Sequence, residues 1–170
     1  MVNSLEKYFA KAQYSSIYKR LLNIGLWFKI PFNLPHKIKI THIDHGIIKM
    51  ELPFIRANKN HINGIHACAL ATLCEYVSGL SLVRVLSADK FRIILKDIHI
   101  TYHYQAKTKV NTSFEINKEI LNSINIQLNA VDAVFETFEV KVYDTLQNHI
   151  CTGKITWQIK NWSKVKTAVS

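Results

Sequence analysis

The sequence has few cysteines, and their number does not suit a disulfide-bonded protein. Cys68, Cys74 and Cys151 are an odd number of thiols, and we recognise no secretory signal peptide. Reduced thiols in a cytoplasmic setting are therefore expected. Cys68 and Cys74 fall in a predicted helix, where we expect both to act as small apolar side chains of the core.

Motifs for metal binding are missing as well. No C-x-x-C or H-E-x-x-H spacing occurs, and the eight histidines are scattered along the chain. Structural metal sites in proteins hold their ligands at short, defined spacings, so we expect no metal ion. We also find no internal repeat and no low-complexity segment.

Acidic residues are scarce. The chain has 12 aspartates and glutamates against 22 lysines and arginines, which gives a net charge of +10 at pH 7. This charge favours an anionic partner. The basic residues are spread over the whole chain without a dense run, so they lack the clustered stripe of a nucleic-acid surface and suit a phosphate-bearing small molecule better. We expect no nucleic-acid partner.

The N-terminal region, residues 1–35, shows near-helical spacing of apolar residues over 3–24 and is too short to span a bilayer. Gly25 and the prolines that follow predict the end of this helix. Two interpretations remain open. The helix lies on a membrane surface, because it is basic and aromatic residues follow it, or it packs on the domain, which we favour. No integral membrane segment is expected.

Apolar residues alternate with polar ones in several later segments, which predicts β-strands. The first two form a hairpin over 38–52 that turns at residues 44–46. Residues 117–129 predict a short helix followed by a loop, and 163–170 a frayed tail. The remaining strands are predicted over 91–105, 109–116, 138–143 and 154–160.

One stretch, from Asn60 to Leu80, organises the chain. It passes from polar, turn-forming residues into small and apolar ones, which predicts a helix from about Ile65 to a stop at Gly79. Apolar residues on nearly every side indicate a helix that a sheet surrounds. The predicted fold is therefore α+β, an antiparallel sheet wrapped around a long helix, as one domain over residues 36–162.

Two positions on this helix are candidates for a catalytic role. Ala67 lies in its first turn, where amide groups lack intrahelical partners and the helix dipole favours a developing oxyanion. Glu75 is the one charge within the apolar stretch. The two residues share a face but lie about 12 Å apart along the axis, so they would meet only if two helices ran antiparallel across a dimer.

The same stretch resembles the helix-entry motif of hotdog-fold acyl-CoA thioesterases, especially those similar to phenylacetyl-CoA and 4-hydroxybenzoyl-CoA thioesterases. Their pattern is an Asn, a Gly-containing loop, His-Gly-Gly, and an acidic residue nine positions after the His. Asn60, His66 and Glu75 match these positions. Residues 52–53 and 60–62 also resemble a poorly characterised hotdog family.

The resemblance implies a hotdog fold with an extra N-terminal helix and an enzyme that needs no cofactor. It implies that the Ala67 amide forms the oxyanion hole, that Glu75 acts as general base or nucleophile, and that Asn60 positions water or substrate. His66 is either part of this site or only a helix cap. Gly64 and Cys68 are expected to contact the substrate. Candidates to bind the phosphates of coenzyme A are Arg56 and Lys59, and also Lys90 and Arg92.

The sequence departs from the family at two points. Ala67 and Cys68 replace the two glycines beside the thioester, and Asn63 and Gly64 are shifted by one position relative to the commonest spacing. This leaves alternatives open. The first is acyl-CoA hydrolysis by a homodimer or a dimer of dimers. The second is a protein that binds acyl-CoA or a fatty acyl chain without turnover. A third, a hydratase or dehydratase on the same fold, lacks a convincingly placed Asp/His or His/Glu pair.

Overall fold

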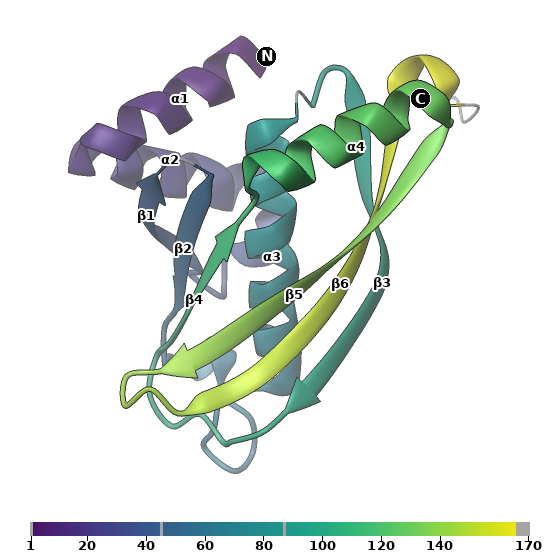
Figure 1. Ribbon diagram of the computed structural model, residues 1–170. Helices are drawn as coiled ribbons and strands as arrows, with labels where there is room; N and C mark the ends of the chain where they lie inside the picture. Colours follow the sequence, from purple (N-terminus) through teal and green to yellow (C-terminus); the bar gives the residue numbers. More distant parts are fainter. Residues whose placement is uncertain (1, 45, 87, 166–170) are drawn as a thin grey trace.

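A single antiparallel sheet wraps around one long helix in the computed structural model, which describes residues 2–44, 46–86 and 88–165 (Figure 1). The sheet has six strands in the order β1-β2-β4-β5-β6-β3. This confirms the predicted α+β class. The strands are β1 (Lys39–Asp44), β2 (Ile47–Leu52), β3 (Phe91–Tyr102), β4 (Val110–Glu115), β5 (Ala133–Asp144) and β6 (His149–Asn161).

The central helix is α3, Ala67–Val85. The predicted stop at Gly79 is wrong, because the helix continues for six more residues. Gly79 is instead a point of close packing: a Cβ atom there would lie 2.7 Å from the ring of Trp157 on β6. The Trp157 Nε1 atom donates a hydrogen bond to Ser78 Oγ at 3.0 Å, which fixes the indole against the helix.

Most of α3 is buried by the sheet, as its apolar composition predicts. By length and hydropathy alone α3 could cross a membrane. However, 61% of its most apolar 18-residue segment is buried inside the fold, so the helix forms part of the core. Cys74 is buried, as expected. Cys68 is exposed, so its predicted core role is wrong: it lies in the first turn of α3, which the sheet leaves uncovered.

The N-terminal region forms two helices instead of the single predicted one, α1 (Val2–Tyr14) and α2 (Ser16–Lys29). Ser15 separates them and caps α2 by accepting a hydrogen bond from the Tyr18 amide. The predicted end at Gly25 is wrong, since Leu26 is buried and α2 runs on for one more turn. The prediction that this region packs on the domain is confirmed by the contacts of α2 with β1.

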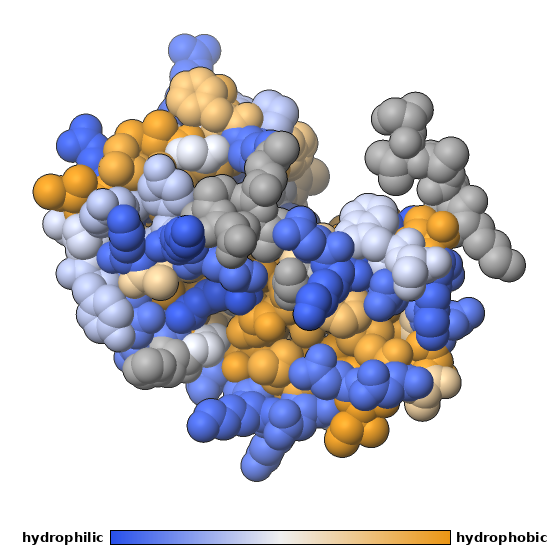
Figure 2. All heavy atoms as spheres, turned by 90° about the horizontal axis from the view of Figure 1, so that it is seen from above, coloured by the Kyte–Doolittle hydropathy of each residue, from blue (hydrophilic) through white to orange (hydrophobic). Residues whose placement is uncertain are grey.

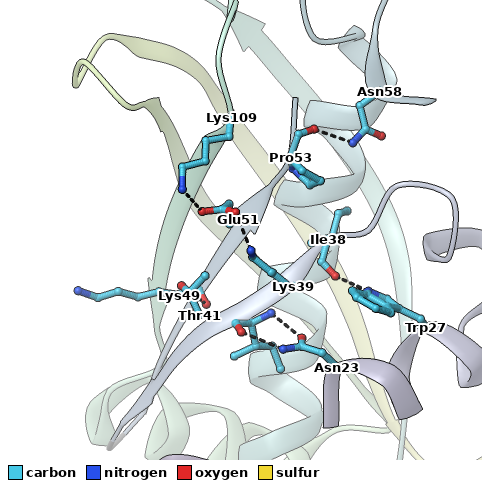
Figure 3. Close-up of polar contacts among 11 residues, drawn as sticks. Asn23, Trp27, Ile38, Lys39, Thr41, Lys49, Glu51, Pro53, Asn58 and Lys109 are labelled. Atoms are coloured by element: carbon cyan, nitrogen blue, oxygen red, sulfur yellow. Dashed lines mark hydrogen bonds and ion pairs between the residues drawn. The ribbon is translucent and has the colours of Figure 1, made fainter. Parts of the chain in front are cut away.

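Side chains of α2 cover the outer edge of β1 (Figure 3). Asn23 donates through Nδ2 to the Ile40 carbonyl at 3.0 Å and accepts from the Ile40 amide at 2.7 Å. Trp27 Nε1 donates to the Ile38 carbonyl at 2.6 Å. Edge strands expose backbone groups that invite pairing with other chains. Two of these hydrogen bonds satisfy the backbone groups of Ile40 on β1, and the third satisfies the carbonyl of Ile38 just before the strand.

The opposite edge of the sheet, β3, is open. Within the described residues β3 pairs only with β6, and no helix lies along its outer side. Apolar side chains of this strand are 36% to 48% exposed, namely those of Ile94, Leu95, Ile98 and Tyr102. The two edges of one sheet therefore differ, and only one is protected from strand pairing.

Three peripheral predictions need correction or completion. Residues 118–130 form a full helix, α4 (Lys118–Ala130), because Asn117 caps it and Ile124 is buried against the fold. The strand predicted to reach Gln105 ends at Tyr102. Of the predicted tail, Trp162–Lys164 form a 3-10 turn, and residues 166–170 lie outside the described residues.

The contact of Gly79 with Trp157 leads to a stability prediction. We expect Gly79→Ala to lower the free energy of unfolding by about 1–3 kcal/mol, because the added methyl group overpacks the indole. Gly25→Ala in α2 is the matched control: nothing lies within 4 Å of a Cβ atom there. It should raise the stability by up to about 1 kcal/mol through helix propensity alone. Urea unfolding of both variants measures the difference, and equal effects would contradict the packing role.

Candidate active site

The loop that leads into α3 is folded around the side chain of Asn60. Its Oδ1 atom accepts hydrogen bonds from the Ile62 amide at 3.1 Å and the Gly64 amide at 2.9 Å. The backbone amide of Asn60 donates a hydrogen bond to the Gly64 carbonyl. Asn63 takes the left-handed conformation that this tight loop needs in order to close. The Asn60 oxygen is thus committed to the loop, while its Nδ2 atom donates no hydrogen bond within the described residues.

A second asparagine, Asn58, anchors this loop to the rest of the domain. Asn58 is fully buried and donates through Nδ2 to the carbonyls of His36 and Pro53. Its backbone carbonyl accepts a hydrogen bond from the His66 amide at 2.7 Å. Figure 3 shows its contact with Pro53. We did not single out Asn58 in the sequence, because nothing in its neighbourhood signals burial.

His66 caps α3. Its Nδ1 atom accepts a hydrogen bond from the Cys68 amide at 3.1 Å, so this nitrogen carries no proton. His66 is exposed. Of the two roles considered for His66, the hydrogen bond from the Cys68 amide supports that of a helix cap.

A pocket of about 340 Å³ opens at the N-terminus of α3. Asn60 and Ala67 line it from the loop and the helix, and the residues that follow β3 close its other side. The Ala67 amide is the first of the helix and donates no hydrogen bond within the described residues. The pocket is lined by Asn60, Ile65, Ala67, Leu70, Tyr102, His103, Tyr104, Gln105 and Ala106.

Two residues that each carry a hydrogen-bond donor without a partner in the described part of the chain therefore line the same pocket: Ala67, with its backbone amide, and Asn60, with its side-chain amide. Both lie at the positive end of the α3 dipole, where negative charge is stabilised. Tyr102 fixes the first turn by donating from its hydroxyl to the Ala67 carbonyl at 3.1 Å. An arrangement of this kind suits a carbonyl oxygen that gains negative charge.

Glu75 lies two turns further along α3 and does not line this pocket. Within the described residues its carboxylate has no ion pair and no hydrogen bond. Burial raises the pKa of Glu75 to about 7, well above its ordinary value. A half-buried, unpaired carboxylate that titrates near neutrality has the properties of a general base. In one chain, however, it does not meet Ala67.

The remaining predicted site residues surround the loop. Gly64 is buried, and a Cβ atom there would lie 2.8 Å from the Gln105 side chain, so it packs the loop against the strand end. Lys59 places its ammonium group 4.0 Å from the centre of the Phe54 ring. Arg56 is exposed on the short 3-10 turn Arg56–Asn58, and Cys68 is exposed beside Ala67. None of these four lines the pocket.

The sequence gives no signal that the residues at the end of β3 belong to this site. Tyr102, His103 and Gln105 lie in the predicted strand, but the alternation there indicated only which side chains share a face. His103 contacts Thr152 Oγ1 at 3.1 Å and its ring lies 4.3 Å from that of His149, so it is held by β6. The chain separation between residues 67 and 102 hides their proximity in the sequence.

Comparison with known proteins agrees with this architecture. A family model described as a domain of unknown function, DUF4442, matches residues 18–159. No curated protein matches the sequence.

Solved structures share the fold. One is a protein of unknown function from Pseudomonas aeruginosa described as a "Probable Thioesterase", with a TM-score of 0.74 and 18% identity, over 79% of this chain and 90% of that one. Another is a variant of a thioesterase from Staphylococcus aureus, with a TM-score of 0.61 and 16% identity, over 76% and 98%. A third is a thioesterase from Haemophilus influenzae, with a TM-score of 0.61 and 12% identity, over 76% and 82%.

These similarities establish the fold, which is the hotdog fold that the helix-entry motif predicted. Because the family model covers most of the chain, the protein belongs to the family described as a domain of unknown function, DUF4442.

Proposed function

We propose that this protein hydrolyses an acyl-CoA thioester at a site shared between two subunits. The observation that carries the proposal is the pair of unpartnered donors, the Ala67 amide and Asn60 Nδ2, in one pocket at the N-terminus of α3. Thioesterases are also described among the solved structures with this fold.

The proposed reaction begins when the thioester carbonyl oxygen binds at the Ala67 amide. Glu75 of the partner subunit removes a proton from a water molecule, whose oxygen attacks the carbonyl carbon. Negative charge develops on the carbonyl oxygen, where the amide and the helix dipole stabilise it. The C–S bond then breaks, and the proton held by the glutamate passes to the departing thiolate of coenzyme A. Asn60 Nδ2 orients the water or the carbonyl.

The shared site follows from the geometry of α3. Ala67 and Glu75 are about 12 Å apart along the axis of one helix. Ala71 lies midway between them and is only half-buried. A twofold axis beside Ala71 brings Glu75 of each chain level with Ala67 of the other. Pairing of the open β3 edges about the same axis would extend the sheet and cover the exposed apolar side chains of that strand.

A second candidate function is binding of an acyl-CoA without turnover. The specific observation in its favour is that Ala67 lines the pocket and Cys68 is exposed beside it, so side chains stand where the resembled enzymes have glycine. In either case the Arg56 and Lys59 side chains are proposed to bind the phosphates of coenzyme A. Free cysteines suit a reducing, cytoplasmic location.

Replacing the Glu75 side chain tests its proposed role as the general base. Glu75→Gln should lower kcat for acyl-CoA hydrolysis by about 10²–10⁴-fold, since the amide cannot accept a proton. In the native protein, kcat/KM should rise with pH through about 7, where Glu75 ionises. Steady-state assays with a thiol-reactive dye and a panel of acyl-CoAs measure both. The exposed Glu139→Gln is the control. Turnover at the native rate by Glu75→Gln would exclude this mechanism.

The same variant makes a prediction about stability that does not depend on activity. Because the folded-state pKa of Glu75 is about 7 and its ordinary value is 4.5, the folded protein holds this proton more tightly than the unfolded chain. Its contribution is therefore greatest below the ordinary pKa and is lost as pH rises towards 7. Glu75→Gln should be more stable than the native protein at alkaline pH, with little difference at acidic pH. Urea unfolding at both pH values tests this.

Replacing Ala67, the first residue of α3, tests the proposed amide donor. Ala67→Pro deletes the proposed amide donor, and proline is well tolerated at this helical position. We expect activity to fall while folding is kept. Ala67→Val is the control, because it adds similar bulk but retains the amide. If Ala67→Val loses as much activity as Ala67→Pro, steric clearance rather than the donor limits the reaction.

Mixing the two inactive variants tests the shared site. A hybrid of an Ala67→Pro chain with a Glu75→Gln chain contains one intact site, so refolded equimolar mixtures should recover about a quarter of the native activity. Sedimentation should give at least twice the 19.6 kDa chain mass. No recovery from hybrids that are shown to form, or full activity in a monomer, would contradict the shared site.

A further inference from the structure

One helix face of the N-terminal region carries large apolar side chains that are exposed. Ile17, Leu21, Ile24 and Phe28 follow one another at intervals of four, three and four residues along α2. At 3.6 residues per turn they fall within about 60° of the helix circumference. Ile17 is 71% exposed and Phe28 73%, and the other two are also exposed. We call these four residues the α2 stripe.

The stripe is not the face that holds α2 on the domain. Leu22 and Leu26 form the buried face, and Asn23 and Trp27 bond to β1. The helix thus has one apolar face in the core and a second one in solvent. Exposed apolar residues gathered in one stripe, unlike scattered ones, indicate a surface that contacts something else.

The region that carries the stripe has an excess of positive charge. Residues 1–35 contain five basic residues and a single acidic one, Glu6. The basic residues are Lys7, Lys11, Lys19, Arg20 and Lys29. In Figure 2 the lobe on the left, where Figure 1 places α1 and α2, exposes hydrophobic atoms in orange beside hydrophilic atoms in blue.

A pocket of about 370 Å³ lies beside the stripe, between α2 and β1. Lys19, Arg20 and Lys39 provide three cationic side chains around it, and Ile24 belongs to both the pocket and the stripe. Glu51 binds Lys39 at 3.0 Å, so that cation is partly neutralised (Figure 3). The pocket has the size and charge to take an anionic headgroup while the stripe enters the acyl region beside it.

We propose that α2 docks this protein on the surface of a membrane that contains anionic phospholipid. The α2 stripe inserts at the boundary of headgroups and acyl chains, and Lys19 and Arg20 contact headgroup phosphates. A helix with an apolar stripe and basic neighbours is suited to a charged lipid surface, whereas a second protein would need no such excess of positive charge. The proposal does not depend on the proposed hydrolase activity.

The docking face stays available in the proposed dimer. α2 lies against β1, and β1 and β3 are the two opposite edges of the sheet. Two chains that pair along β3 therefore carry their α2 helices at the far ends of the joined sheet. Membrane contact and dimer formation use different surfaces, so each is testable without the other.

The test is flotation of the full chain with vesicles of phosphatidylcholine alone or mixed with phosphatidylglycerol. We expect binding to the mixed vesicles, weakened by added salt, and little binding to phosphatidylcholine alone. The double variant Ile17→Ser/Phe28→Ser should bind mixed vesicles at least about tenfold more weakly, because two large apolar side chains no longer enter the bilayer.

The matched control is Ile126→Ser/Leu146→Ser, which removes two side chains of similar exposure, 70% and 77%, from α4 and the β5–β6 turn. It should bind like the native protein. Because all four positions are exposed, thermal unfolding should show both double variants folded. Equal binding by the two double variants, or no binding of the native protein to either vesicle, would overturn the proposal.

A second pair of variants tests the charge. Lys19→Gln/Arg20→Gln should weaken binding to mixed vesicles and abolish most of the salt dependence, while Lys107→Gln/Lys118→Gln should not. Sedimentation of the Ile17→Ser/Phe28→Ser variant tests the alternative that the α2 stripe binds another copy of this protein. If Ile17→Ser/Phe28→Ser halves the native mass and vesicles never bind, the stripe is a contact between copies of this chain and the membrane assignment is wrong.

Discussion

The structure depends on covering α3, a helix with no polar face for most of its length. A sheet of six strands is wide enough to surround most of it, and the side chains of Leu73, Cys74, Val77 and Leu82 become completely buried. Coverage is incomplete at both ends of the helix: Ala67 and Cys68 are exposed, Ala71 and Glu75 are half-buried, and so are residues 83–85 of the last turn. The incompletely covered N-terminal part of the helix is also the part that carries the unpartnered amide and the unpaired carboxylate.

Local hydrogen bonds position this uncovered end. Asn58 ties the entry loop to the strand side of the domain, Asn60 closes the loop, and Tyr102 holds the first turn of α3. Each uses polar atoms that would be costly to bury unpaired. Their combined effect is to keep two donors, on Asn60 and Ala67, facing one pocket without giving either of them a protein partner.

The sequence predicted those features that periodicity and capping control. The first two strands follow from the alternation over residues 38–52, the other four from that over 91–160, and the central helix from residues 60–80. It did not predict that α3 passes through Gly79, because the reason is the ring of Trp157, which is 78 residues away. The same limit hid Tyr102 and Asn58, whose roles arise from contacts across the fold. The split at Ser15 is local, but near-helical spacing continues across it and conceals the break.

The two edges of the sheet explain how one domain can carry separate surfaces. At β1, Asn23 and Trp27 of α2 bond to the strand backbone, so further pairing there is blocked. Covering an edge with a helix leaves that helix with an outer face, and here the outer face is apolar. At β3 no helix of the described residues provides such a cover. The N-terminal extension that closes one edge thus leaves the other open and presents the α2 stripe at the closed side.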